Sequence, residues 1–140
     1  MEGLALPLIN LGVLHGENQI RKAYEDAHIV VSASSYETLP GTLVEAQAYG
    51  CLPVSFNQGG QTDIIRNLST GVIASYSEDP HERAINLSQA IITALSLLAF
   101  PDFSPEKTDA LLEKMRQSVS QKFSYASVVN QYLSLIQTLS

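Results

Sequence analysis

The chain has little positive charge, one cysteine and no tryptophan. Eight Lys and Arg against fourteen Asp and Glu give a formal net charge of −6, which argues against non-specific binding to nucleic acid or to an anionic membrane. A single cysteine, Cys51, rules out an internal disulfide and favours a reducing compartment. The start Met-Glu-Gly lacks the basic region of a signal peptide, and no apolar run reaches spanning length. We therefore expect a cytoplasmic protein without nucleic-acid partners.

The first half of the chain alternates strand patterns with helix patterns. With 140 residues, 45% of them hydrophobic, the chain fits one domain. Continuous apolar runs such as Ile29-Val30-Val31 are typical of parallel strands that are covered on both faces. Such alternation predicts an α/β, partial Rossmann-like fold with a mostly parallel sheet of about four strands. We expect strands at 6–11, 28–32, 53–56 and 72–74, and helices at 17–25, 40–49 and 61–67.

The second half of the chain is predicted to be helical. Asp79 and Pro80 are typical of a helix start, and Pro101 ends that helix. Further helices are expected at 105–121 and 123–139, the last with an apolar face. We therefore divide the single domain into βα units at 6–78 and C-terminal helices at 79–140.

Two carboxylates, Glu37 and Glu45, flank a predicted helix start at Pro40-Gly41. The first backbone N–H groups of a helix lack intrahelical partners and carry partial positive charge, which suits a phosphate. The two oxygens of an ionised carboxylate can accept hydrogen bonds from vicinal hydroxyls of a sugar. A sugar, a diphosphate and a ribose would then lie along Glu37, the helix start and Glu45.

The surrounding motifs resemble the donor-binding half of retaining GT-B glycosyltransferases, the glycosyl transferases group 1 family. The resemblance runs from Leu11 to about Ala94 and rests on an ordered series: Leu11-Gly12-Val13-Leu14, Glu37-(x7)-Glu45-Ala46-Gln47-Ala48-Tyr49-Gly50, Gly59-Gly60-Gln61-Thr62-Asp63 and Gly71-Val72-Ile73.

The resemblance implies a role for each matched residue. Glu37 would be the catalytic residue that holds hydroxyls of the donor sugar, and Glu45 would hold the ribose. The amides of Gly41, Thr42 and Leu43 would hold the diphosphate. The segment from Val13 to His15 would contact the base. No Asp-x-Asp motif is present, so we expect neither a metal nor another cofactor.

The chain departs from the family pattern in three ways. Pro40 stands where many members have glycine, and Asp63 stands where glutamate is common. No Arg or Lys precedes Arg21, whereas the family supplies an Arg and a Lys for the leaving diphosphate. The resemblance thus implies a truncated donor-binding domain, inactive alone, whose acceptor, a sugar or lipid-linked molecule, is bound mainly by a missing N-terminal domain. Exposed strand edges also predict self-association.

The leading hypothesis is the donor-binding part of a bacterial enzyme that transfers a hexose, with retention, from a nucleotide-diphosphate sugar. Its context would be polysaccharide or glycoconjugate synthesis, for example of the cell envelope. The full-length protein would be cytoplasmic or peripheral to the inner face of the membrane. Two alternatives remain open: a sugar-nucleotide epimerase of the same fold, and a non-catalytic nucleotide-binding or interaction module.

Overall fold

Three short strands of β-branched and apolar residues form the centre of the fold. The computed structural model describes residues 9–99 and 105–139, and its strands are β1 (Ile29–Val31), β2 (Leu52–Phe56) and β3 (Val72–Ala74). They form one parallel sheet in the order β1-β2-β3. Ile29 pairs with Leu52, and Val54 pairs with Val72. The predicted α/β fold with a parallel sheet and C-terminal helices is confirmed.

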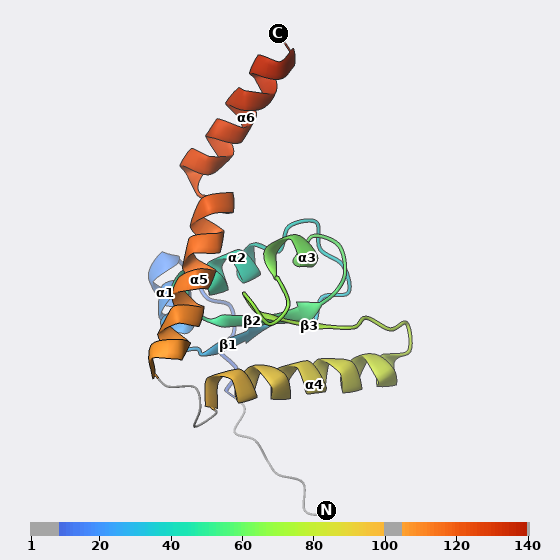
Figure 1. The fold of residues 1–140 in the computed structure, drawn as a ribbon. Coiled ribbons are helices and arrows are strands. Elements are labelled where there is room, and N and C mark those ends of the chain that lie inside the picture. The colour runs from blue at the N-terminus through green and yellow to red at the C-terminus, as the bar shows by residue number, and fades with distance from the viewer. Residues whose placement is uncertain (1–8, 100–104, 140) are drawn as a thin grey trace, which may run out of the picture.

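Helices cover both faces of this sheet. Helix α4 (Pro80–Ala99) lies under β2 and β3, and α2 (Gly41–Tyr49) with α5 (Pro105–Phe123) lies on the opposite side (Figure 1). All five residues of β2 are buried. Leu52, Val54 and Phe56 pack in one cluster with Ala90 and Ala94 of α4. Burying each large apolar side chain contributes about 1.5–3 kcal/mol, so the central strand anchors the fold.

The remaining helices lie around this body. Helix α1 (Glu17–Glu25) precedes β1, the short α3 (Gln61–Ile64) follows β2, and α6 (Tyr125–Leu139) ends the described chain. Helix α6 extends away from the sheet (Figure 1), and none of its residues is buried by the described chain. The apolar face that the sequence predicts there is exposed, as at Tyr132 and Ile136.

Two predicted elements differ from the structure. Of the strand expected at 6–11, residues 6–8 lie outside the described part, and residues 9–11 form no strand because no described strand lies beside them. The sheet of the described residues therefore has three strands rather than about four. The helix expected at 61–67 ends at Ile64 because Ile65 is extended and the Arg66 amide donates to Thr70 Oγ1 at 2.8 Å.

Candidate functional site

The first turn of α2 presents backbone donors to the surface. Pro40 is the N-cap in an extended conformation (φ −72°, ψ 94°), and no described side chain caps the helix. The Leu43 amide donates to the Pro40 carbonyl at 3.0 Å. Gly41 and Thr42 are exposed, and their amides have no acceptor among the described residues. This leaves two free N–H groups at the positive end of a helix. A ligand that accepted a hydrogen bond from the Leu43 amide would have to share its proton with the Pro40 carbonyl.

Packing, rather than capping, fixes the position of α2. Leu43, Ala46 and Gln47 are buried, and Gly50 ends the helix in the left-handed region (φ 81°). The Gln47 Nε2 donates to the carbonyls of Ile64, at 3.2 Å, and Thr70, at 2.7 Å. The buried side-chain amide of Gln47 therefore connects α2 to the 64–70 segment through two hydrogen bonds. These contacts hold α2, and with it the exposed first turn, in a fixed position.

A glycine turn after β2 holds the loop that carries Glu37. The Gly60 amide donates to the Glu37 carbonyl at 2.8 Å, and the buried Gln61 Nε2 donates to the Ser34 carbonyl at 3.1 Å. A Cβ at Gly60 would lie 1.9 Å from the carbonyl oxygen of Thr38, so a side chain there requires the loop to move. The Glu37 carboxylate itself is half-buried and has no hydrogen-bond or ion-pair partner among the described residues.

A tyrosine from α1 orients the carboxylate of Glu45. Tyr24 Oη donates to Glu45 Oε2 at 2.8 Å, and its ring stacks on Tyr49 with centroids 5.3 Å apart. Partial burial raises the pKa of Tyr24, and the hydrogen bond to Glu45 and the Glu45 charge raise it further. The phenol therefore stays a proton donor at neutral pH. Glu45 Oε1 has no partner among the described residues, and Oε2 keeps one lone pair after it accepts from Tyr24.

The local sequence pattern does not predict this contact between Tyr24 and Glu45. The two residues are 21 positions apart on different helices. No spacing rule links an aromatic residue on one helix to a carboxylate on the next, so the sequence carries no signal for this contact.

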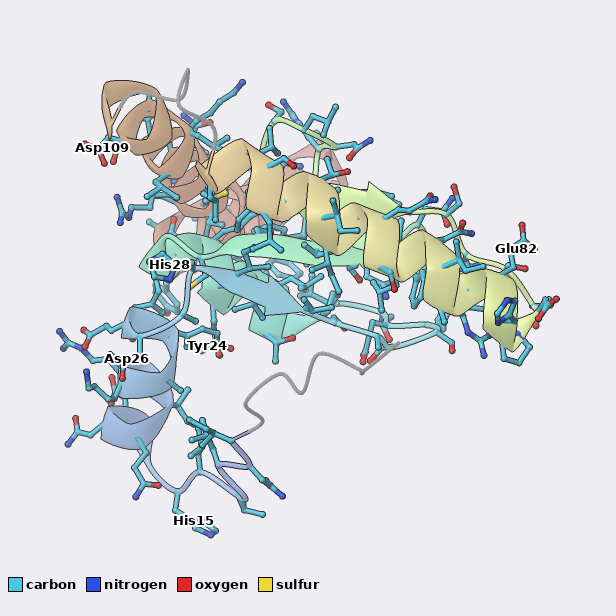
Figure 2. All side chains as sticks on the ribbon, turned by 90° about the horizontal axis from the view of Figure 1, so that it is seen from below. His15, Tyr24, Asp26, His28, Glu82 and Asp109 are labelled. Atoms are coloured by element: carbon cyan, nitrogen blue, oxygen red, sulfur yellow. The ribbon has the colours of Figure 1, made fainter. Side chains whose placement is uncertain are left out.

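The segment expected to contact the base lies at the other end of α1. Val13 is exposed, and His15 is exposed with its amide donating to Gln19 Oε1 at 2.8 Å. Figure 2 shows His15 beyond the N-terminal end of α1, with Tyr24 towards the opposite end. Among the described residues, no hydrogen bond connects Val13 or His15 to Glu37, Glu45 or the first turn of α2.

Cys51 is a free and buried thiol. Its S–H group donates to the backbone carbonyls of Tyr24 at 3.1 Å and Ala27 at 3.3 Å. Burial raises the pKa of this thiol, while the charge of Arg116 lowers it. A protonated, hydrogen-bonded thiol is unreactive, so Cys51 serves to pack α1 against β2.

The electrostatics of the site come from the helix and the carboxylates. The basic residues of α1 are paired within that helix, Arg21 with Glu25 and Lys22 with Asp26. In the described part of the chain, no ion pair involves Glu37 or Glu45. Residues 9–99 and 105–139 also contain no group of three or more His, Cys, Asp or Glu that could hold a metal ion. The arrangement suits a hydroxyl-rich ligand that carries an anionic group at the α2 first turn.

Within the described residues, no helix combines the length and apolar character needed to cross a bilayer.

Comparison with known proteins finds one matching family model and similar curated proteins. The family model described as glycosyl transferases group 1 matches residues 6–97. The glycogen synthase of Pseudomonas fluorescens strain Pf0-1 is 27% identical over 132 residues, which cover 94% of this chain and 24% of the relative. The glycogen synthase of strain Pf-5 is 26% identical over 132 residues, covering 94% of this chain and 23% of the relative. The chain thus spans about a quarter of the length of these curated relatives.

Solved structures of similar fold are consistent with the family match. A glycosyltransferase from Rickettsia africae superposes with a TM-score of 0.68 at 26% identity, over 85% of this chain and 29% of that chain. Sucrose-phosphate synthase from Thermosynechococcus elongatus gives 0.63 at 25% identity, over 84% and 26%. Anabaena Alr3699/HepE in complex with UDP-glucose shares the fold alone, with a TM-score of 0.57 at 18% identity, over 84% and 29%. Since the family model matches well over half of the chain, the protein belongs to the glycosyl transferases group 1 family, with the α/β fold of GT-B glycosyltransferases.

Proposed function

We propose that this chain binds the donor of a glycosyltransferase, a nucleotide-diphosphate sugar, at the first turn of α2. The observation that carries the proposal is the pair of free amides at Gly41 and Thr42, with Glu37 on the loop before them and Glu45 one turn beyond. The diphosphate accepts hydrogen bonds from the two amides. Glu37 accepts from hydroxyls of the sugar, and Glu45 Oε1 accepts from the ribose while Tyr24 holds Oε2.

The transferred group is proposed to be a hexose, moved with retention of configuration and without a metal ion. A hexose donor is supported by the names of the relatives, which are glycogen synthases and a sucrose-phosphate synthase, and by the UDP-glucose complex of the Anabaena protein. These names favour polymer or glycoconjugate synthesis, with storage polysaccharide as a context in addition to cell-envelope polysaccharide. We propose that this synthesis takes place in the cytoplasm.

The leaving diphosphate needs more positive charge than two amides supply, because negative charge builds up on it as the glycosidic bond breaks. No cation pairs with the described site. We propose that an Arg and a Lys from elsewhere in the whole enzyme complete it, and that the acceptor is bound mainly by an additional domain. This chain alone would then bind the donor weakly and not transfer the sugar.

Calorimetric titration with UDP-glucose tests the binding site. Glu45→Gln and Glu37→Gln should each weaken binding at least about tenfold, because a hydrogen bond to a charged group contributes roughly 1.5–3 kcal/mol. Glu78→Gln is the matched control, since Glu78 is an exposed glutamate in the loop before α4. Equal affinity in all three variants would contradict the proposal.

Transfer is tested in the full-length enzyme. Glu37→Ala should abolish turnover, because the sugar would no longer be held for attack. Unchanged turnover in this variant would rule out the catalytic role proposed for Glu37, even if the calorimetry supported binding.

Self-association through a strand edge is a separate proposal. Strand β1 is an edge strand in the described sheet, and Val31 is 42% exposed. Unpaired edges favour pairing between chains. Light scattering at high protein concentration should detect a dimer that Val31→Lys removes. A strict monomer would count against this idea without bearing on donor binding.

A further inference from the structure

A hollow in the protein surface lies at the outer edge of β3, where that strand meets α4. Its volume is about 320 Å³. Its lining includes the apolar residues Val72 and Ala90 and three residues with side-chain amides, Asn67, Asn86 and Gln89. Helix α4 lies on the face of the sheet opposite α2 (Figure 1), so this hollow, here called the β3–α4 groove, is separate from the α2 first turn.

Two of these side-chain amides, those of Asn67 and Asn86, are held in place by hydrogen bonds to the backbone at the edge of β3. Asn67 Oδ1 accepts a hydrogen bond from the Ile73 amide at 3.0 Å, which leaves its Nδ2 as an oriented free donor. Asn86 Nδ2 donates to the Ser75 carbonyl at 3.1 Å, which leaves its Oδ1 as an oriented free acceptor. One donor and one acceptor are therefore held in place before any ligand arrives, which lowers the entropic cost of binding.

The remaining polar side chains of the lining are uncharged. The side-chain amide of Gln89 has no partner among the described residues and offers both a donor and an acceptor. The Thr93 hydroxyl donates to the Gln89 carbonyl at 2.9 Å, so its lone pairs remain free to accept. No charged side chain belongs to the lining in the described part of the chain.

This chemistry discriminates between ligand classes. An anion would find no cation in the groove, and an added β-strand would find the Ile73 amide and the Ser75 carbonyl already taken by side chains. Sugar hydroxyls both donate and accept, so they match side-chain amides that do the same. We propose that the β3–α4 groove binds a neutral oligosaccharide, as a site additional to the donor site.

Heteronuclear NMR of the labelled 140-residue chain tests this site. Maltohexaose and cellohexaose are the probes, and inorganic phosphate is the negative control. At least one sugar should cause saturable shifts in the backbone amides of 67–75 and 86–93 and in the side-chain NH₂ signals of Asn67, Asn86 and Gln89. Phosphate should cause none there. Because UDP-glucose binds elsewhere in the proposal above, its presence should not displace the sugar.

Matched variants make the outcome decisive. Gln89→Ala should weaken sugar binding at least about threefold, since one hydrogen bond contributes about 1 kcal/mol. Its fold should be intact because the side chain has no partner in the described structure. Gln117→Ala on α5 is the control and should bind normally. The proposal is overturned by no saturable shift up to about 50 mM sugar, by shifts confined to other segments, or by equal affinity in Gln89→Ala and the wild type.

Discussion

Helices α2 and α4 begin in opposite ways. At α4 the chain caps itself: the His81 amide donates to Asp79 Oδ1 at 2.8 Å, and Ser77 Oγ donates to Glu82 Oε2 at 2.7 Å. At α2 no described side chain caps the helix, and its first turn contains no acidic residue. Helices α1 and α3 also begin without a described side-chain cap, so α4 is the exception among α1 to α4 and the free donors of α2 follow from the residues at its own start.

The uncapped start of α2 has a cost that packing offsets. A missing N-cap costs about 1 kcal/mol relative to a good one. Buried Leu43 and the two hydrogen bonds of Gln47 hold the helix instead. The stability of α2 thus comes from its inner side, which leaves its outer first turn available to a ligand.

The largest expected effect comes from breaking the turn that supports the loop before α2. Gly60→Ala should destabilise the protein by about 3 kcal/mol, because the new Cβ would lie 1.9 Å from the Thr38 carbonyl oxygen. Urea unfolding followed by circular dichroism measures this. Gly41→Ala is the control, since an added Cβ there meets nothing within 4 Å. Equal stability of the two variants would show that the turn does not constrain the loop.

The next effect comes from giving α2 the acidic first turn that α4 has. Thr42→Asp should lower affinity for UDP-glucose at least about tenfold, because a carboxylate repels the diphosphate. The same change should stabilise the fold by about 0.5 kcal/mol through the helix dipole.

Thr42→Asn is the neutral control for this change and should bind nearly as well as the wild type. Calorimetry and urea unfolding give the two readouts. If Thr42→Asp bound UDP-glucose normally, the diphosphate would have to lie elsewhere.

A smaller effect follows from removing the cap of α4. Asp79→Ala should cost about 1 kcal/mol of stability, because the His81 amide loses its acceptor. Asp79→Asn should keep most of that stability, since its side-chain oxygen can still accept. UDP-glucose affinity should be unchanged in both variants, and a loss of affinity would show that the two helix starts are not independent.

The smallest effect concerns Tyr24 and depends on pH. Tyr24→Phe should cost about 0.5 kcal/mol at neutral pH, at the low end for a hydrogen bond, because Glu45 is exposed and water can replace the lost donor. The pKa of Tyr24 is raised in the folded state. Above the ordinary tyrosine pKa of about 10, the unfolded chain therefore loses a proton that the folded chain keeps, and stability falls.

The stability difference between wild type and Tyr24→Phe should accordingly shrink above a pH of about 10. Urea unfolding at neutral and alkaline pH checks it. Tyr125→Phe is the matched control, because Tyr125 is 87% exposed and should show no such change. A constant difference across this range would contradict the assigned cause of the pKa shift.

The elements of the fold were largely predictable from local patterns. The helices at Glu17–Glu25 and Gly41–Tyr49 and the strand at Val72–Ala74 occur where periodicity, Pro40 and Gly50 place them. The prediction failed in the described part of 6–11, because a strand needs a neighbour and the local pattern does not show whether one exists. It also extended α3 past Ile64, because the competing side chain of Thr70 lies outside the predicted helix.

The candidate site was predictable in its composition but not in its contacts. Glu37, Glu45 and the start of α2 follow from the motif and from helix chemistry. The partners that shape them do not: Tyr24 at Glu45, Gln61 at the Ser34 carbonyl and Gly60 at the Glu37 carbonyl each act across the fold. The functional roles of Glu37, Glu45, the first turn of α2, Val13 and His15 all stay predictions.

The sequence alone determined the alternation of strands and helices, the start of α2 at Pro40 and the two carboxylates beside it, because these depend on neighbours within a few residues. Only the tertiary structure decided that Tyr24 occupies one oxygen of Glu45, that the Leu43 amide is already used, and that side-chain amides line a groove at β3. Those contacts join residues from separate elements, and their geometry is set by how the elements pack.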